Sequence, residues 1–202
     1  MCFHTQQTKD AKTLENRFKA KFRQEDMPLI TGVYNGFDHP KTPIITAQEP
    51  DIIQCVEWGL VPWWSKDKAM QNSCLNARIE TLREKPSFSG ILHRKCLILL
   101  DGFFEWQWID PKGKEKQKYL ITLPNNEPFA FAGLWTEWKN PQSGDLLNTY
   151  TIITTEAKGI MREIHNSKLR MPVILTQGNE RPWLNDQRRA DLNLELEAVK
   201  LS

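Results

Sequence analysis

The first candidate for chemistry is the cysteine at position 2. Cys2 follows Met1 directly, and removal of Met1 would leave Cys2 with both a free amine and a thiol. Their ordinary pKa values, about 7.7–8.0 for the amine and about 8.5 for the thiol, leave both groups partly reactive near neutral pH. Such an amine can attack a carbonyl carbon, and the neighbouring thiol can then close a thiazolidine ring on that carbon. The alternative is that Cys2 is incidental at a ragged terminus.

A carboxylate, Glu105, stands among aromatic residues in the segment DGFFEWQW. Removing a carboxylate from water among such side chains disfavours its charged form and raises its pKa. A carboxyl group of this kind exchanges protons near neutral pH, which predicts a general acid–base. An exposed strand residue between two buried ones has the same spacing, so this segment alone leaves both interpretations open.

Two further segments carry polar groups suited to a substrate with phosphates. In NARIET, Asn76 offers an amide donor and acceptor, and Arg78 offers a planar fork for a phosphate or a carboxylate. In IHNSKLRMP, His165 can transfer a proton near neutral pH, with Lys168 and Arg170 nearby. The plain interpretations are a helix start with a surface ion pair, and a histidine at a helix C-terminus before a basic loop.

Tryptophan is unusually abundant, with 8 in 202 residues. Trp63 and Trp64 follow Pro62 at an expected strand end, where their rings could stack on bases or fill the core. The net charge of +2 and the sequence pI of about 8.3 do not provide a broad basic face. A nucleic acid would therefore bind in a local groove.

The composition, with 40% hydrophobic and 26% charged residues, is typical of a globular protein, and we expect one domain over residues 1–202. No run approaches the ~18 apolar residues of a membrane span, and the first residues lack the apolar stretch of a signal peptide. These features predict a cytoplasmic protein with reduced thiols, nuclear if its source is eukaryotic. The 4 cysteines form no CxxC pair and the histidines are scattered, so no metal site is expected.

The elements that must position these residues follow from periodicity and turn signals. The segment 10–23 places apolar residues about one turn apart and predicts an amphipathic helix. Short strands are expected near 30–34 and 43–47, and a longer one from 51 to Gly59. The segment 75–85 favours a short helix that stops before Pro86.

The second half of the chain is rich in strand signals. Segments 94–109 and 118–124 flank the turn-like DPKGKEKQ and predict a hairpin, and 129–138 with 147–157 predict a second one. We expect a helix over 156–165, a strand over 170–176, and one or two short helices over 182–202. The sum is an α+β fold with a mainly antiparallel, curved, barrel-like β core flanked by short helices.

Taken in order, several segments resemble the SRAP (SOS response-associated peptidase) family. They are Cys2 after Met1, WG and PWW at 58–64, NARIET at 76–81, CLILLDGFFEW at 96–106, FAGLW at 131–135, IITTEA at 152–157, and IH with RMPVIL at 164–175. Each block alone is weak, but their identity and order together are specific and span most of the chain. The resemblance implies an SRAP-like fold and covalent crosslinking to abasic sites in single-stranded DNA.

The resemblance also implies roles for the matching residues. Cys2 would form the crosslink, with Asn76, Glu105 and His165 as its catalytic partners. The implied DNA-binding residues comprise arginines for phosphates, tryptophans for the nucleotides beside the lesion and wall residues of the groove: Arg78, Arg170, Trp63, Trp64, Asn35, Met171 and Pro172. The protein would act as a monomer without metal or cofactor. Its partner would be single-stranded DNA with abasic sites, and it would lie at the nucleoid when bound.

The chain departs from the family pattern after Cys2 and before Arg170. Family members usually begin Met-Cys-Gly-Arg, whereas Phe3 and His4 stand here, and the usual His-x-Arg-Met-Pro is lengthened to HNSKLRMP. These differences affect the backbone path after Cys2, one expected phosphate contact and the position of Arg170. Two other functions stay open. One is an N-terminal-nucleophile cysteine amidohydrolase or peptidase, and the other is a noncovalent single-stranded DNA-binding module.

Overall fold

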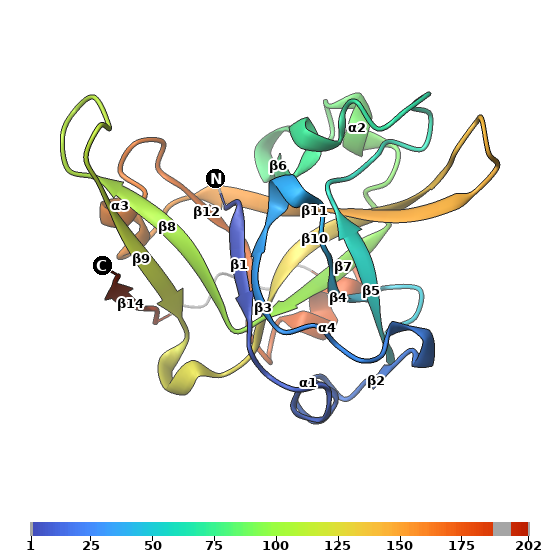
Figure 1. The fold of residues 1–202 in the computed structure, drawn as a ribbon, viewed down its shortest axis with the longest axis horizontal. Helices are drawn as coiled ribbons and strands as arrows, with labels where there is room; N and C mark the ends of the chain where they lie inside the picture. Colours follow the sequence, from blue (N-terminus) through green and yellow to red (C-terminus); the bar gives the residue numbers. More distant parts are fainter. Residues whose placement is uncertain (1, 188–194, 202) are drawn as a thin grey trace.

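The computed structural model of the chain describes residues 2–187 and 195–201. Its centre is a closed ring of five strands, in the order β5 (Ile52–Trp58), β4 (Lys41–Thr46), β7 (Lys95–Leu100), β10 (Phe129–Lys139) and β11 (Leu146–Glu156). Neighbouring strands are antiparallel, except that β11 runs parallel to β5 where it closes the ring. The predicted α+β class with a mainly antiparallel, barrel-like core is confirmed (Figure 1).

Short strands extend the ring at its edges. β11 pairs in parallel with β6 (Asn76–Arg78) and antiparallel with β12 (Arg170–Pro172), so both short strands meet β11 at its residues 152–156. β13 (Ile174–Leu175) follows β12 but pairs with β10, and β2 (Lys21–Phe22) pairs with β5.

A second sheet contains the N-terminal strand. Its strand order is β14 (Glu197–Lys200), β9 (Lys116–Thr122), β8 (Gly102–Trp108), β1 (His4–Gln7) and β3 (Gly32–Asn35). All of its pairings are antiparallel. The inner face of this sheet joins the core inside the ring, since Phe103 and Ile121 pack with the apolar side chains that line the ring.

Two apolar clusters sit on opposite faces of the ring strands. On β7, Cys96, Ile98 and Leu100 point into the ring, whereas Leu97 and Leu99 point to a second cluster outside it. Because side chains alternate along a strand, a strand buried on both faces reads as an unbroken apolar run. This explains the segment CLILL and why its hydrophobic pattern does not alternate.

The helices are short and lie between strands. They are α1 (Ala11–Phe18), α2 (Pro86–Ser89), α3 (Met161–Ile164) and α4 (Glu180–Leu184), with 3₁₀ turns at Gln24–Asp26, Gly36–Asp38, Gln71–Cys74, Ile79–Thr81 and Pro124–Asn126. Within the described residues, no helix is both long and apolar enough to cross a membrane.

Two of the helix predictions in the first half of the chain are wrong in extent or type. The helix expected over 10–23 ends at Phe18, because Lys19 adopts the left-handed conformation (φ 54°) and Phe22 joins β2 instead. The segment 75–85 is not a helix, since Asn76–Arg78 pairs with β11 and a 3₁₀ turn follows. A helix begins at Pro86 rather than stopping before it. In both segments, pairing with a neighbouring strand outweighs local helix propensity.

The second half follows the predictions more closely. Both hairpins are confirmed, as β8–β9 and β10–β11, but the first arm expected over 94–109 is divided into β7, which pairs with β4 and β10, and β8. The expected helix over 156–165 is restricted to α3, and the strand over 170–176 is divided between β12 and β13. The tail prediction of helices alone is wrong, because β14 adds a strand to β9; residues 188–194 lie outside the described part.

Gly133 offers a test of ring packing. A Cβ there would lie 2.4 Å from Cδ1 of Ile98 and 2.8 Å from both the Cys96 sulfur and the Thr151 carbonyl oxygen. Because one of these atoms is backbone, the clash cannot be relieved by a side-chain rotation alone. We expect Gly133→Ala to reduce the free energy of unfolding by about 1–3 kcal/mol, measured by urea denaturation.

The matched control is Gly178→Ala, because a Cβ at Gly178 meets no atom within 4 Å. Equal unfolding midpoints for the two variants would contradict the close packing of β10 between its neighbours.

Candidate active site

Cys2 is held in the interior by its backbone. Its side chain is fully buried among the apolar residues inside the ring. Its carbonyl oxygen accepts a hydrogen bond of 2.8 Å from Nδ2 of Asn76, the first residue of β6. Its thiol lies 3.6 Å from the carbonyl oxygen of His4. The residue that sequence analysis placed at the centre of the chemistry therefore lies in the core, tied to the NARIET segment.

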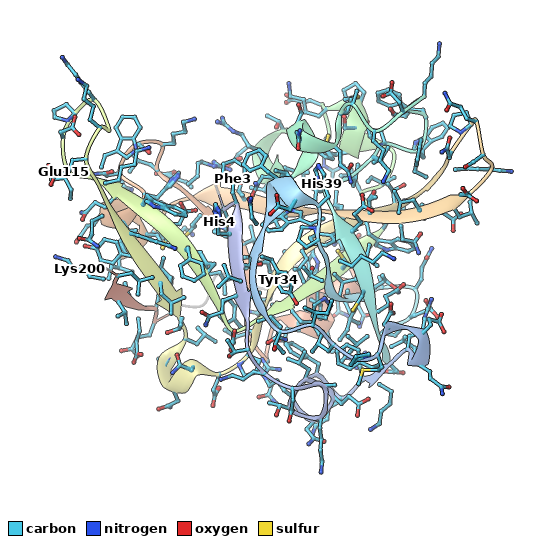
Figure 2. The ribbon with its side chains drawn as sticks, in the orientation of Figure 1. Phe3, His4, Tyr34, His39, Glu115 and Lys200 are labelled. Atoms are coloured by element: carbon cyan, nitrogen blue, oxygen red, sulfur yellow. The ribbon has the colours of Figure 1, made fainter. Side chains whose placement is uncertain are left out.

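The next residue, Phe3, joins this end of β1 to the neighbouring 3₁₀ turn. Its carbonyl oxygen accepts a hydrogen bond of 2.8 Å from Gly36, and its ring packs on Phe37 with centroids 4.9 Å apart. Figure 2 shows Phe3 and His4 side by side at the end of β1. The bulky residue that departs from the family pattern thus fills the space beside the Gly36–Asp38 turn.

Asp101 fixes the other end of β1. This residue connects β7 to β8, and its carboxylate accepts hydrogen bonds from the backbone and hydroxyl of Thr8. Lys9 lies 3.6 Å from the same carboxylate, and the Asp101 backbone N–H donates to the carbonyl oxygen of Gln6. These contacts set the position of β1 against β8, which carries Glu105.

Glu105 and His165 approach each other in the interior, and Glu105 lies near Cys2. The distance between His165 Nε2 and Glu105 Oε2 is 3.7 Å, and both side chains are buried. Burial raises the pKa of Glu105 to about 7. Burial lowers the pKa of His165 to about 4, and the nearby positive charges of Lys168 and Arg170 add to the shift. Near neutral pH the imidazole is therefore uncharged, while Glu105 is poised to take up or release a proton.

The hydrogen bonds of His165 define its tautomer. Its Nδ1 accepts a hydrogen bond of 3.0 Å from the backbone N–H of Arg170. A neutral imidazole whose Nδ1 is an acceptor carries its proton on Nε2. That N–H faces Glu105, so the imidazole can stabilise the carboxylate when it forms.

The Cys2 thiol is electrostatically coupled to Glu105. Burial raises the pKa of Cys2 well above its usual range, and the nearby Glu105 carboxylate raises it further. The resting thiol is therefore protonated near neutral pH. Its reaction requires a base, and Glu105 is the adjacent group with a suitable pKa.

Asn76 keeps one polar atom available. Its Nδ2 binds Cys2, whereas its buried Oδ1 accepts no hydrogen bond from any residue that the structure describes. A buried carbonyl oxygen without a donor is energetically costly. A hydroxyl or amine entering the site would supply the missing hydrogen bond.

Trp63, Trp64 and Arg78 lie on the surface. The side chains of Trp63 and Trp64 are 62% and 44% exposed, although Trp64 Nε1 contacts the carbonyl oxygen of Pro86 at 3.4 Å. Arg78 is exposed at the end of β6, two residues after Asn76. The rings are thus available for stacking, and the guanidinium is available for a phosphate.

The other residues expected to line a DNA groove are not exposed in this way. Arg170 is buried and forms a bidentate ion pair with Glu80, at 2.8 and 2.9 Å, and also donates to the carbonyl oxygen of Thr154. Met171 and Pro172 are buried in β12. Asn35 is half-buried and accepts a hydrogen bond from the Phe37 backbone, as the N-cap of the 3₁₀ turn.

Sequence analysis missed a second surface, on the outer side of the β8–β9 hairpin. Trp106 pairs with Lys118 and Trp108 pairs with Lys116, on the face opposite Glu105. We call these four residues the aromatic–lysine face. Lys118 lies 5.6 Å from the Trp106 ring and Lys116 lies 5.6 Å from the Trp108 ring. The sequence signal for this surface is the spacing of the two tryptophans in FEWQW and of the two lysines in KQK. Residues two apart in a strand lie on the same face of a sheet.

His4 borders the aromatic–lysine face. Its ring meets the Trp106 ring edge-on, with centroids 5.0 Å apart. Burial lowers the pKa of His4, and the charge of Lys118 lowers it further. The positive charge beside Trp106 therefore comes from Lys118 rather than from His4.

Within residues 2–187 and 195–201, no cluster of His, Cys, Asp and Glu side chains is arranged to hold a metal ion. The cysteines at 2, 55, 74 and 96 are free thiols. Cys2 is thus present in the reduced form that a nucleophile requires.

Comparison with known proteins identifies a family and several relatives of this chain. A family model described as SOS response associated peptidase (SRAP) matches residues 1–200. YoqW of Bacillus subtilis (strain 168), named an abasic site processing protein, is 47% identical over 131 residues, covering 64% of this chain and 56% of YoqW. HMCES of Gallus gallus, with the same description, is 35% identical over 159 residues, covering 66% of this chain and 45% of that protein. The chain thus spans about half the length of these curated relatives.

Solved structures agree with the family match. A protein from Bacteroides thetaiotaomicron aligns with a TM-score of 0.86 and 29% identity, covering 100% of this chain and 92% of its own. A protein from Bordetella bronchiseptica aligns with a TM-score of 0.83 over 100% of both chains, and at 23% identity it supports the fold alone. The chain belongs to the SRAP family, the SOS response associated peptidases.

Proposed function

We propose that this protein processes abasic sites in single-stranded DNA by forming a covalent bond to the lesion through Cys2. The observation that carries the proposal is the convergence of Asn76, Glu105 and His165 on Cys2 inside the ring. The names of YoqW and HMCES as abasic site processing proteins give the substrate class. The protein would then act wherever single-stranded DNA with such lesions is exposed.

The chemistry follows from a cysteine whose amine is free. The open-chain form of an abasic deoxyribose carries an aldehyde. The Cys2 amine adds to its carbon, a proton moves to the oxygen, and loss of water leaves an imine. The thiol then adds to the imine carbon and its proton passes to the nitrogen, which gives a thiazolidine ring. Both nucleophiles belong to one residue, so the second step has a high effective concentration.

The neighbouring residues have complementary parts in these steps. Glu105, with a pKa of about 7, accepts a proton from the amine or thiol and returns it to the departing hydroxyl. Neutral His165 directs its Nε2 proton at Glu105 and assists opening of the sugar ring. Asn76 holds the Cys2 backbone through Nδ2 and presents Oδ1 to the incoming sugar or amine.

Binding would use surfaces on both sides of Cys2. Trp63 and Trp64 would stack on nucleotides next to the lesion, and Arg78 would bind a phosphate. The aromatic–lysine face would bind the strand on the other side, with its tryptophans for bases and its lysines for phosphates. We propose that Arg170 acts through its ion pair with Glu80, which anchors the segment that carries His165.

A second candidate is hydrolysis of an amide, since the family is described as a peptidase. The same thiol and carboxyl groups could cleave the bond between Met1 and Cys2, which would free the amine that the crosslink needs. On this view autocatalytic removal of Met1 precedes crosslinking, and the two activities share Glu105 and Cys2.

The decisive experiment uses protein whose intact mass shows loss of Met1. It is mixed with single-stranded DNA carrying an abasic site and analysed on a denaturing gel. We expect a heat-stable shifted band that is absent with Cys2→Ala. Cys2→Ser should form the imine but no comparably stable adduct, because its oxygen closes a weaker ring.

Cys55→Ser is the matched control, because Cys55 lies in β5 with its thiol outside this cluster, and it should crosslink as the parent does. A native shift without a denaturing one would leave only noncovalent binding. Turnover of amide substrates without any DNA adduct would favour the hydrolase.

Glu105 provides a test of the proton transfer. We expect Glu105→Gln to slow adduct formation by about 100-fold or more, since a general acid–base typically supplies that factor. In the parent protein the rate should fall as the pH drops below about 7, where Glu105 becomes protonated and cannot accept a proton. In Glu105→Gln this limb should move to the ordinary amine range of about 7.7–8.0. Single-turnover rates from pH 5.5 to about 9 measure it, and an unchanged midpoint would exclude Glu105 as the base.

The aromatic–lysine face is tested by the salt dependence of noncovalent DNA binding. Replacing Lys116 and Lys118 by Gln should weaken binding and reduce the slope of log K against log salt by roughly 0.7 for each phosphate that is no longer neutralised. Lys12→Gln is the control, since Lys12 lies on α1, away from the β8–β9 hairpin (Figure 1). Equal slopes for the control and the double variant would show that DNA does not reach this face.

A further inference from the structure

Among the residues that the structure describes, no strand pairs with β8 beyond Phe104 on the edge that faces α3. β1 pairs with β8 only from Gly102 to Phe104, whereas β9 follows the opposite edge of β8 as far as Trp108. At the free edge, α3 and the segment after it lie against β8 (Figure 1). The backbone groups of Trp108 at this edge therefore need partners that no described strand provides.

Asn166 supplies both of those partners. Its Oδ1 accepts a hydrogen bond of 3.0 Å from the Trp108 N–H, and its Nδ2 donates one of 2.9 Å to the Trp108 carbonyl oxygen. The carboxamide thus pairs with Trp108 as a peptide group of a neighbouring strand would. A further bond of 3.2 Å joins Gln107 Nε2 to the carbonyl oxygen of Glu163.

These contacts bear on the reacting groups through short covalent paths. Asn166 directly follows His165, and Trp108 stands three residues after Glu105 in an extended strand. We propose that Asn166 is a positioning residue, whose paired hydrogen bonds to Trp108 set the approach of His165 to Glu105. The effect of Asn166 on catalysis rests on the proposed function. Its effect on the distance between His165 and Glu105 rests on geometry alone.

A separate contact fixes the orientation of the imidazole. His165 Nδ1 binds the Arg170 N–H at 3.0 Å, and the Leu169 N–H donates to the His165 carbonyl oxygen at 2.9 Å. Both contacts lie within the 165–170 segment and would persist if that segment moved away from β8. Loss of the Asn166 contacts would therefore change the distance to Glu105 while the tautomer stays the same.

The 165–170 segment makes up most of the lengthened stretch HNSKLRMP. Because Asn166 in this segment is exposed, it can be replaced for a test. Asn166 is exposed on the side away from Trp108, so its replacement leaves the core closed. The charged groups near His165 are Glu105 from β8, the amino terminus of the chain, and Lys168 and Arg170 from its own segment. When the segment separates from β8, water reaches the imidazole and the burial that depresses its pKa is reduced.

The experiment compares Asn166→Ala with Asn140→Ala. Asn140 also accepts a backbone hydrogen bond, from Gln142 at 2.9 Å, but it lies in the turn between β10 and β11. We expect Asn166→Ala to slow adduct formation on abasic single-stranded DNA by about tenfold or more. Affinity for the same strand with a tetrahydrofuran site, which has no aldehyde, should stay unchanged. Asn140→Ala should alter neither quantity.

The second readout is the pKa of His165, followed by NMR of the imidazole ring. The parent value of about 4 should rise by about one unit in Asn166→Ala, because burial decreases.

The two readouts separate the possible failures. An Asn166→Ala variant with parental rate and parental His165 pKa would overturn the positioning role. A parent protein that forms no adduct would overturn the proposed function, while the His165 titration would still decide whether Asn166 sets its surroundings. Equal weakening of tetrahydrofuran-DNA binding and of adduct formation would also overturn the inference, since it would place Asn166 in DNA binding.

Discussion

The pairing of β11 with four other strands is the constraint on which the site depends. Its residues 149–150 close the ring against β5, and its residues 152–156 hold β6 and β12. β6 begins at Asn76, and β12 begins at Arg170, whose backbone binds His165. The same strand, β11, therefore closes the ring and positions the residues of the site. A change that shifts β11 in register would separate Asn76 from the His165 segment as well as open the core.

The second constraint is the cost of keeping Glu105 inside an apolar enclosure. Its burial is comparable to that of the surrounding aromatic residues, and the neutral form of the carboxyl group is favoured up to about pH 7. The same enclosure keeps the Cys2 thiol protonated and the His165 imidazole neutral. Near neutral pH the Cys2 thiol and the His165 imidazole are thus uncharged, and the ionisation of Cys2 is coupled to the charge of Glu105. Such coupling is typical of sites that transfer protons rather than of ion pairs that stabilise a fold.

Much of the site could be predicted from sequence, because the types of its residues and their order along the chain indicate which residues belong to it. Through the resemblance to the SRAP family they predict Cys2, Asn76, Glu105 and His165 as the site, and the fold brings the four residues together. Their arrangement could not be predicted, since it depends on pairings between strands far apart in sequence. The burial of Arg170 depends on Glu80, which is 90 residues away. Local propensity favours a helix at Asn76. It takes no account of β11, a strand much later in the chain, with which this segment pairs.

The two faces of β8 carry different groups. Glu105 points into the ring, and the neighbouring Trp106 points out to Lys118. Insertion of a single residue between Asp101 and Glu105 would exchange these faces, placing the carboxylate in water and an indole in the enclosure. The length of the corner at Asp101 and Gly102 is therefore as constrained as the Asp101 carboxylate that holds β1. Natural variation in this part of the chain should accordingly consist of substitutions, with insertions and deletions confined to the hairpin loop at 109–115.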